Sequence, residues 1–213
     1  MIPRYEFRSM VLTYKYRTIK SKISHPRLMN TTVFEQFFTD CVGNWQSDRT
    51  YHYLTHQEIE RSQTTFEVEP LTSNGKAKVL ADNGYKKLDN LEALPGFNLG
   101  FYTISETGEE KRQNLNLMFV PKSGDNTILE GDYLRDRAYE EDRPIISHFS
   151  FDSIKRELLM TTNYTRVVSV DSITLTNPKL RIRKILNYEK PPAGQSLQNV
   201  LLVGFGVEKK VVI

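Results

Sequence analysis

The chain has 213 residues, a net charge of +3 and a single cysteine, Cys41. A chain of this length forms one or two domains and buries roughly 70% of its unfolded surface, so it can fold without a metal or a disulfide. No apolar run approaches the ~18 residues of a membrane-spanning helix. One cysteine excludes an intramolecular disulfide, and the small net charge does not indicate nucleic-acid binding.

The first thirty residues differ from the rest in charge. They contain seven Lys or Arg side chains and one acid, Glu6. An arginine-rich, acid-poor beginning is typical of an organelle transit segment, and it is equally consistent with a basic tail on a mature protein. We therefore treat residues 1–30 as a basic N-terminal extension and residues 31–213 as the folded domain.

A short helix is expected in residues 30–43. Asn30 or Thr31 can cap its start, and the aromatic and aliphatic residues that follow form an apolar stripe at helical spacing. Gly43 is expected to end this helix. A second helical segment is expected over residues 76–94, after a turn at Asn74-Gly75 and before Pro95-Gly96.

The remaining sequence indicates β-strands. Residues 45–55 and 58–70 alternate polar and apolar side chains, and from Phe97 onward the chain reads as successive hairpins. Strand signals separated by turns at roughly 8–14 residues are typical of an antiparallel sandwich or barrel. Gly43-x-Trp45, just before the first strand, is a hallmark of lipocalin-type barrels. We predict an all-β, lipocalin-like antiparallel barrel of about nine or ten strands with short flanking helices.

Arg49 is the first candidate site residue. Period-two geometry places it on the same strand face as Trp45, Ser47, Tyr51 and Tyr53. If Trp45 closes the barrel floor, Arg49 points into the cavity, where a guanidinium requires an anion or other acceptors. Two interpretations remain open: an internal pair with an acidic side chain, or a site for a ligand that carries a carboxylate.

Further charged residues lie on later strands. Arg181 and Arg183 alternate with apolar residues, and one of the two could pack against Trp45; exposure at the sheet surface is the alternative. Arg135 and Arg137 have the same spacing. Asp171 lies in an apolar strand, where it either meets N–H donors inside the barrel or caps a turn.

Other kinds of chemistry find little support. The histidines are isolated and show no metal-ligand spacing, and the sequence contains neither a nucleophile elbow nor a phosphate-binding glycine-rich loop. Cys41 is expected to be a small apolar residue at the end of the first helix.

Two segments together resemble a known family. The stretch "FFTDCVGNWQSDRTYHYL" carries Gly43, Trp45, Ser47, Arg49 and His52, and "NPKLRIRK" follows at residues 177–184. With these motifs, the chain resembles the S-type phycobiliprotein lyases, the CpcS/CpeS chromophore lyase family, over roughly residues 33–212. The resemblance implies a ten-stranded lipocalin-like barrel that binds an open-chain tetrapyrrole, a phycobilin such as phycoerythrobilin or phycocyanobilin, without a covalent bond.

The resemblance also implies a lyase reaction. The enzyme would promote thioether attachment of the bilin, its substrate, to a cysteine of an apo-phycobiliprotein subunit, with no further cofactor and no metal. Such a protein would work in the plastid of a red alga or cryptophyte, or in a cyanobacterial cytoplasm; whether it forms a homodimer stays open. The implied catalytic residues are Asp171 and His148, and the implied ligand-binding residues are Trp45, Arg49, Tyr51, His52, Arg135, Arg181 and Arg183.

Two departures from the family pattern bear on catalysis. A family Glu-Arg-x-Trp stretch reads Asp171-Ser172-Ile173-Thr174 here, and a family arginine aligns with His148. A histidine donates to a carboxylate more weakly and in a pH-dependent way. Bilin binding is therefore expected more firmly than full lyase activity. The alternatives are a non-catalytic lipocalin-like carrier and a ligand-free assembly factor for phycobiliproteins.

Overall fold

A computed structural model describes residues 26–136 and 143–211. Within these ranges the chain forms two α-helices, one short 3-10 helix and ten strands. The helices are α1 (Pro26–Cys41), α2 (Ser73–Asp82) and η1 (Leu91–Ala93). The strands are β1 (Gly43–Tyr53), β2 (Glu58–Pro70), β3 (Gly96–Ser105), β4 (Glu110–Gly124), β5 (Ile128–Arg135), β6 (Ser147–Asp152), β7 (Glu157–Asn163), β8 (Val167–Asn177), β9 (Leu180–Glu189) and β10 (Val200–Val211).

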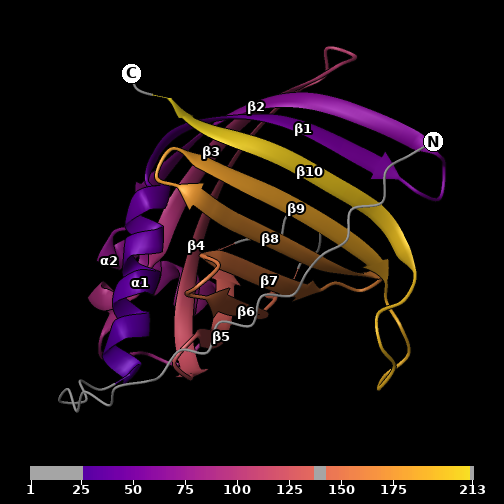
Figure 1. Cartoon of the computed structure of the whole chain (residues 1–213). Coiled ribbons are helices and arrows are strands. Elements are labelled where there is room, and N and C mark those ends of the chain that lie inside the picture. Colours follow the sequence, from indigo (N-terminus) through magenta and orange to yellow (C-terminus); the bar gives the residue numbers. More distant parts are fainter. Residues whose placement is uncertain (1–25, 137–142, 212–213) are drawn as a thin grey trace, which may run out of the picture.

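The ten strands close into one antiparallel barrel. Each strand pairs with its sequence neighbours, and β10 pairs with β1 to complete the ring. Figure 1 shows the strands running beside one another from β1 to β10, with the helices gathered at one end. Closure removes every sheet edge. The predicted lipocalin-like barrel is therefore confirmed, including its upper estimate of ten strands.

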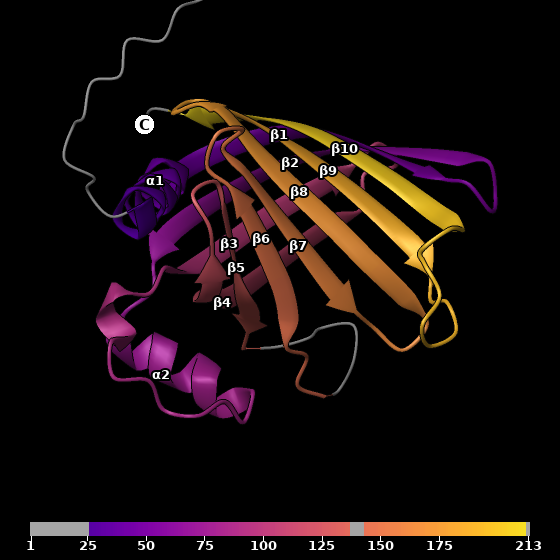
Figure 2. The same ribbon diagram turned by 60° about the horizontal axis from the view of Figure 1, so that its bottom comes forward.

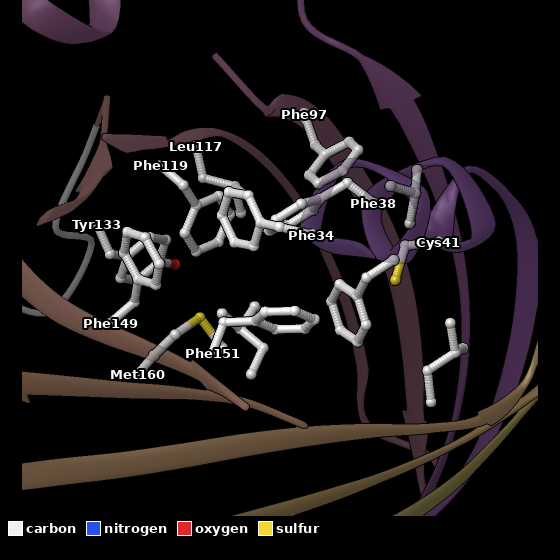
Figure 3. Packing of buried hydrophobic residues seen from close by; sticks show 14 of the residues in the cluster. Phe34, Phe38, Cys41, Phe97, Leu117, Phe119, Tyr133, Phe149, Phe151 and Met160 are labelled. Carbon is white, nitrogen blue, oxygen red and sulfur yellow. The ribbon is translucent and has the colours of Figure 1, made fainter. Parts of the chain in front are cut away.

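Helix α1 covers the barrel end at which β1 begins. Phe34 stacks on Phe149 with ring centroids 5.5 Å apart, and Phe38 lies 4.7 Å from Phe119. Figure 3 shows these α1 side chains lying among aromatic residues of the strands. Burial of several aromatic rings is the main source of stability for this contact. The apolar core thus occupies the α1 end of the barrel.

The start of α1 differs from the prediction. The helix begins at Pro26, so a cap at Asn30 or Thr31 is wrong because both residues lie inside it. Proline suits the first helical turn, since the N–H that it lacks would have no helical partner there. Residues 26–30, assigned above to the extension, belong to this helix, and residues 1–25 lie outside the described residues.

Helix α2 packs outside the barrel, against β4 and β5 (Figure 2). The Thr72 hydroxyl caps it by accepting a hydrogen bond from the Gly75 backbone N–H at 3.2 Å. Asn74-Gly75 therefore lies in the first helical turn, and the predicted turn is wrong. The turn preference of Asn-Gly is outweighed by the Thr72 cap and by the burial of Val79 and Leu80 against Met118 of β4. No helix within the described residues combines the length and hydrophobicity needed to cross a membrane.

Candidate ligand-binding cavity

A cavity of about 430 Å³ occupies the barrel interior. This volume falls in the range of small-molecule sites, roughly 300–1,000 Å³. Its floor includes Phe37, Phe38 and Cys41 of α1. The opposite end is lined by residues near the end of β1 and the start of β2, including Tyr53 and Glu60. We call this second end the mouth.

Trp45 lies beneath the floor and organises it. Its side chain is 1% exposed, and its indole N–H donates to the Cys41 carbonyl at 2.9 Å, which joins β1 to the end of α1. The Arg181 guanidinium lies over the indole ring, with its central carbon 4.5 Å from the centroid. The prediction that one of Arg181 and Arg183 packs against Trp45 is confirmed for Arg181, and solvent exposure of that residue is excluded.

We expect Trp45→Phe to lower the free energy of unfolding by about 1–2 kcal/mol, because the Cys41 carbonyl loses its donor. Urea unfolding followed by circular dichroism measures this, since the substitution removes the one tryptophan of the chain. An unchanged midpoint would show that this hydrogen bond does not hold α1 in place.

Glu208 of β10 is a buried acid near the floor, with arginine partners from β9 and β1. It is fully buried and accepts a hydrogen bond from Arg181 Nε at 2.5 Å, and its second oxygen lies 3.5 Å from Arg49. Burial alone would raise the pKa of Glu208, but attraction to Arg181, Arg183 and Arg49 outweighs it and holds the pKa below its usual value. The carboxylate therefore stays ionised and carries its negative charge inside the barrel.

Arg49 lies between the floor and the mouth and lines the cavity. Its side chain is 13% exposed, and its Nε donates to the Ser47 hydroxyl at 3.3 Å. Its pair with Glu208 is long and lacks a hydrogen bond to that second carboxylate oxygen. The structure is consistent with both interpretations of Arg49. It has an acidic partner inside the barrel, Glu208, and its guanidinium also lines the cavity, where it is available to a carboxylate ligand.

Ser62 lies directly opposite Arg49 on β2. Its side chain is buried and lines the cavity, and its hydroxyl has no hydrogen-bond partner among the described residues. A buried hydroxyl without a partner is unfavourable unless another group satisfies it. Arg49 and Ser62 together therefore present donors suited to a carboxylate.

Arg183 and Asp171 form a second ion pair in the cavity wall. Arg183 Nε donates to one Asp171 oxygen at 3.0 Å, and its Nη2 donates to the other. Asp171 lies in the middle of β8, so the alternative of a turn cap is excluded. Burial lowers and Asp171 raises the pKa of Arg183, with a net rise well above its usual value. This pair keeps both charges inside the barrel.

Arg135 lines the cavity from β5, and its Nη2 donates to the Tyr164 hydroxyl at 2.7 Å. Tyr51 lines the cavity from β1, as the predicted strand face requires. The structure thus brings Arg49, Tyr51, Arg135, Asp171, Arg181 and Arg183 around one cavity. Arg137 lies outside the described residues.

Three expected site residues do not line the cavity. Trp45 is buried beneath the floor, which corrects the expectation that it contacts the ligand. His52 is exposed on the outer face of β1, since its neighbours Tyr51 and Tyr53 point inward. His148 is exposed on β6 and lies 3.8 Å from Glu130 on the outer surface. Strand alternation explains both histidine positions, because residues next to an inward side chain point outward. We therefore correct the expectation that these histidines face the ligand site.

The mouth holds an acid that was not among the expected site residues. Tyr53 Oη donates to Glu60 Oε2 at 2.9 Å across β1 and β2. Burial and this hydrogen bond raise the pKa of Tyr53 to about 12, so its phenol stays protonated. Glu60 makes no ion pair with any of the residues that the structure describes. Alternation along β2 could have indicated that Glu60 shares the inner face with Ser62 and Phe66.

Cys41 contributes its thiol to the floor without free access to solvent. Burial raises the pKa of this thiol, which the nearby Arg181 only partly offsets. The thiol therefore stays protonated and unreactive at neutral pH. Across the described ranges, the His, Cys, Asp and Glu side chains form no group of three that could hold a metal ion.

Two glycines of β10 make room for side chains of β1. A Cβ at Gly204 would lie 2.9 Å from the Tyr51 ring, closer than real contacts allow. A Cβ at Gly206 would lie 3.1 Å from the Ser47 hydroxyl oxygen and 3.5 Å from Arg49 Cγ. The missing side chains let Tyr51 and Arg49 lie close to the wall instead of filling the cavity.

The barrel and its cavity agree with comparisons to known proteins. The description "CpeS-like protein" belongs to the family whose sequence model matches residues 33–211. "Chromophore lyase CpcS/CpeS 1" of Synechococcus sp. (strain JA-3-3Ab) is 56% identical over 178 residues, which cover 84% of this chain and 96% of that protein. "Chromophore lyase CpcS/CpeS" of Thermosynechococcus vestitus is 27% identical over 147 residues, which cover 69% and 79%.

A solved structure has the same fold. The S-type phycobiliprotein lyase CPES from Guillardia theta superimposes with a TM-score of 0.67 at 15% identity, over 90% of this chain and 99% of that one. The family match covers most of the chain, and the Synechococcus relative is similar over nearly its full length. The chain therefore belongs to the CpeS-like family, whose curated relatives are named chromophore lyases.

Proposed function

We propose that this protein is a phycobiliprotein chromophore lyase. It binds a phycobilin non-covalently in the barrel cavity and promotes thioether attachment of the bilin to a cysteine of an apo-phycobiliprotein subunit. The observation that carries the proposal is the set of arginines around the cavity, which suits a ligand with two acidic arms. Membership in a family of chromophore lyases supports the reaction.

The charge of the cavity supports an acidic ligand. Among the described residues, five cationic side chains line it, and they are Arg49, Lys111, Arg135, Arg181 and Arg183. Two lining carboxylates, Glu60 and Asp171, and the buried Glu208 oppose them. Cationic side chains therefore outnumber carboxylates among the described residues around the cavity, which favours a ligand that carries acidic groups such as the propionates of a phycobilin. Desolvated arginine–carboxylate contacts are strong and bidentate.

The position of the charges suggests how the bilin lies. The propionates belong to the two inner rings of the open-chain tetrapyrrole, and Arg49, Ser62 and Arg183 lie between the floor and the mouth. A ligand held there by its acid arms would turn its reactive terminal ring towards the mouth. Holding the bilin in one conformation, facing an incoming cysteine, is catalysis by positioning.

A transfer assay tests the proposal. Absorption titration with phycocyanobilin and phycoerythrobilin is expected to show binding, and addition of apo-phycobiliprotein subunits is expected to yield a covalent subunit that fluoresces with zinc after denaturation. Binding without covalent product would identify a carrier. Product without prior binding, or no binding of either bilin, would exclude the proposed cavity mechanism.

Asp171 is proposed to accept a hydrogen bond from pyrrole N–H groups while Arg183 holds its carboxylate in place. We expect Asp171→Asn to shift the absorption maximum of the bound bilin, because a neutral amide no longer stabilises charge on the pyrrole nitrogens. Absorption spectroscopy of the complex measures this. A spectrum identical to that of the unaltered protein would exclude contact between Asp171 and the chromophore.

The cellular location of the protein is part of the same proposal. The relatives named above are cyanobacterial, and phycobilins occur where phycobiliproteins are assembled. We propose a cyanobacterial cytoplasm or an algal plastid.

A further inference from the structure

We propose that Glu60 is a catalytic residue at the mouth of the cavity: its carboxylate takes the proton from the acceptor cysteine, and Tyr53 orients that carboxylate. This inference rests on the proposed lyase function and assigns the acid–base group that the reaction needs.

The acceptor cysteine has to approach from the mouth. At the other end, aromatic side chains of α1 pack against the strands, and Trp45 lies beneath them with the Arg181 guanidinium over its ring. A cysteine on a folded subunit cannot pass this packed floor. Its thiol therefore meets the ligand near the ends of β1 and β2, where Tyr53 and Glu60 line the cavity.

The reaction requires a proton acceptor there. The thiol proton leaves, the sulfur electron pair forms the S–C bond at the ethylidene carbon, and the displaced π electrons take up a proton at the adjacent ring carbon. No oxidant or reductant is involved, and one proton is lost and one gained. A free cysteine has a pKa of about 8.5, so only a few per cent is thiolate at neutral pH. A base at the mouth would remove this limit and could return the proton to carbon.

Glu60 differs from the other acids of the cavity in its partner. Asp171 is held by Arg183, and Glu208 is held by Arg181 and Arg49. Glu60 instead accepts a hydrogen bond from the neutral phenol of Tyr53 at 2.9 Å. Among the acids of the cavity that the structure describes, Glu60 is therefore the one that is not engaged in an ion pair, and it lies at the end from which the thiol arrives.

Tyr53 is suited to positioning this carboxylate. Burial, the hydrogen bond and the charge of Glu60 raise its pKa to about 12, so it remains a donor throughout the pH range of the assay. One Glu60 oxygen is engaged, and the other can face a thiol. Among the described residues, the other ionisable side chains at this end of the cavity are Tyr51 of β1, Glu58 of β2, Lys111 of β4, Arg135 of β5 and Tyr164 after β7, with Arg49 deeper in the cavity.

The test measures single-turnover transfer between pH 6 and 9 with the full chain, using phycocyanobilin with apo-phycocyanin subunits and phycoerythrobilin with apo-phycoerythrin subunits. Glu60→Gln keeps the shape of the side chain but cannot take a proton. We expect bilin affinity within about twofold of the unaltered protein and transfer slowed about 100-fold at pH 7, the scale of general acid–base catalysis. The deficit should shrink as the pH rises towards the thiol pKa.

Glu67→Gln is the matched control, because Glu67 lies exposed on the same strand and points away from the cavity. It should transfer at the unaltered rate. Tyr53→Phe should slow transfer less than tenfold, since the carboxylate remains. A larger loss for Tyr53→Phe than for Glu60→Gln would assign the proton to the phenol and overturn the proposal.

The other outcomes are equally decisive. Normal bilin binding with an unaltered rate in Glu60→Gln, or a deficit of equal size at every pH, would overturn the role of Glu60 and leave the lyase function intact. Loss of bilin binding in this variant would make Glu60 a ligand contact, not a base. Failure of the unaltered protein to bind either bilin would instead overturn the proposed function itself.

Discussion

Replacing Arg181 with methionine is expected to lower the free energy of unfolding by about 3–5 kcal/mol, because Glu208 stays buried without its closest partner and must either carry a poorly compensated charge or take up a proton. Glu208 is fully buried, and Arg181 Nε is its hydrogen-bond donor at 2.5 Å. The substitution also removes one of the two cations that lie over the Trp45 ring, the other being Lys210. Chemical unfolding at pH 7 measures the loss.

The double variant Arg181→Met with Glu208→Gln is the control for this prediction. It removes the buried charge together with its partner, and we expect it to recover much of the lost stability. If the double variant is as unstable as Arg181→Met alone, the cost arises from lost packing on Trp45 and the electrostatic account is wrong.

The stability difference between the unaltered protein and Arg181→Met should depend on pH in one direction. In the unaltered protein the pKa of Glu208 is below its usual value, so its contribution to stability is fully present above the unfolded pKa and is lost as the pH falls through the folded one. Without Arg181, burial favours the protonated acid. The stability difference between the two proteins should therefore be smallest at acid pH and grow as the pH rises.

Replacing Arg49 with glutamine is expected to weaken bilin binding about 10–100-fold. A hydrogen bond to a charged group contributes roughly 1.5–3 kcal/mol, which corresponds to a factor of that size. Arg49 lines the cavity beside the unpartnered Ser62 hydroxyl, and Glu208 keeps its closer partner, Arg181. Stability should change little while affinity falls. Absorption or fluorescence titration with phycocyanobilin measures the dissociation constant.

Arg61→Gln is the control for Arg49→Gln. Arg61 lies exposed on β2 and pairs with Glu106 outside the cavity. Its removal deletes the same charge at a similar height of the barrel, so it separates a local contact from a general electrostatic effect. Equal losses for both variants would assign the effect to net charge, and an unchanged affinity in Arg49→Gln would exclude Arg49 as a carboxylate ligand.

Most of the fold could be predicted from the sequence because the strands alternate clearly and follow one another as hairpins. The same alternation placed Trp45, Arg49 and Tyr51 on the inner face, and in the structure Arg49 and Tyr51 line the cavity while Trp45 is buried beneath its floor. The helix ends were harder to predict. The Asn74-Gly75 pair favours a turn in isolation, but the Thr72 cap and the packing of α2 on β4 and β5 decide the local structure.

Part of the site could not be predicted, because a single sequence does not show which residues of neighbouring strands lie opposite each other. Glu208 and Arg181 lie on different strands, and they meet because β9 and β10 pair in one particular register. The acid at the mouth, Glu60, carries no local motif. His52 and His148 were assigned to the site by family resemblance, against the alternation of their own strands, and the alternation proved the better guide to their position.

Because Gly204 and Gly206 have no side chains, the width of the cavity can be changed at these positions independently of the charged residues that line it. A single added methyl group at position 204 would meet the Tyr51 ring and press it inward, so the hollow would narrow while its ionic side chains stayed the same. The cavity would then select ligands by their shape, while the arginines available to bind their carboxylates would be unchanged. Substitutions at these two positions of β10 would therefore change the width of the cavity before they change its charge.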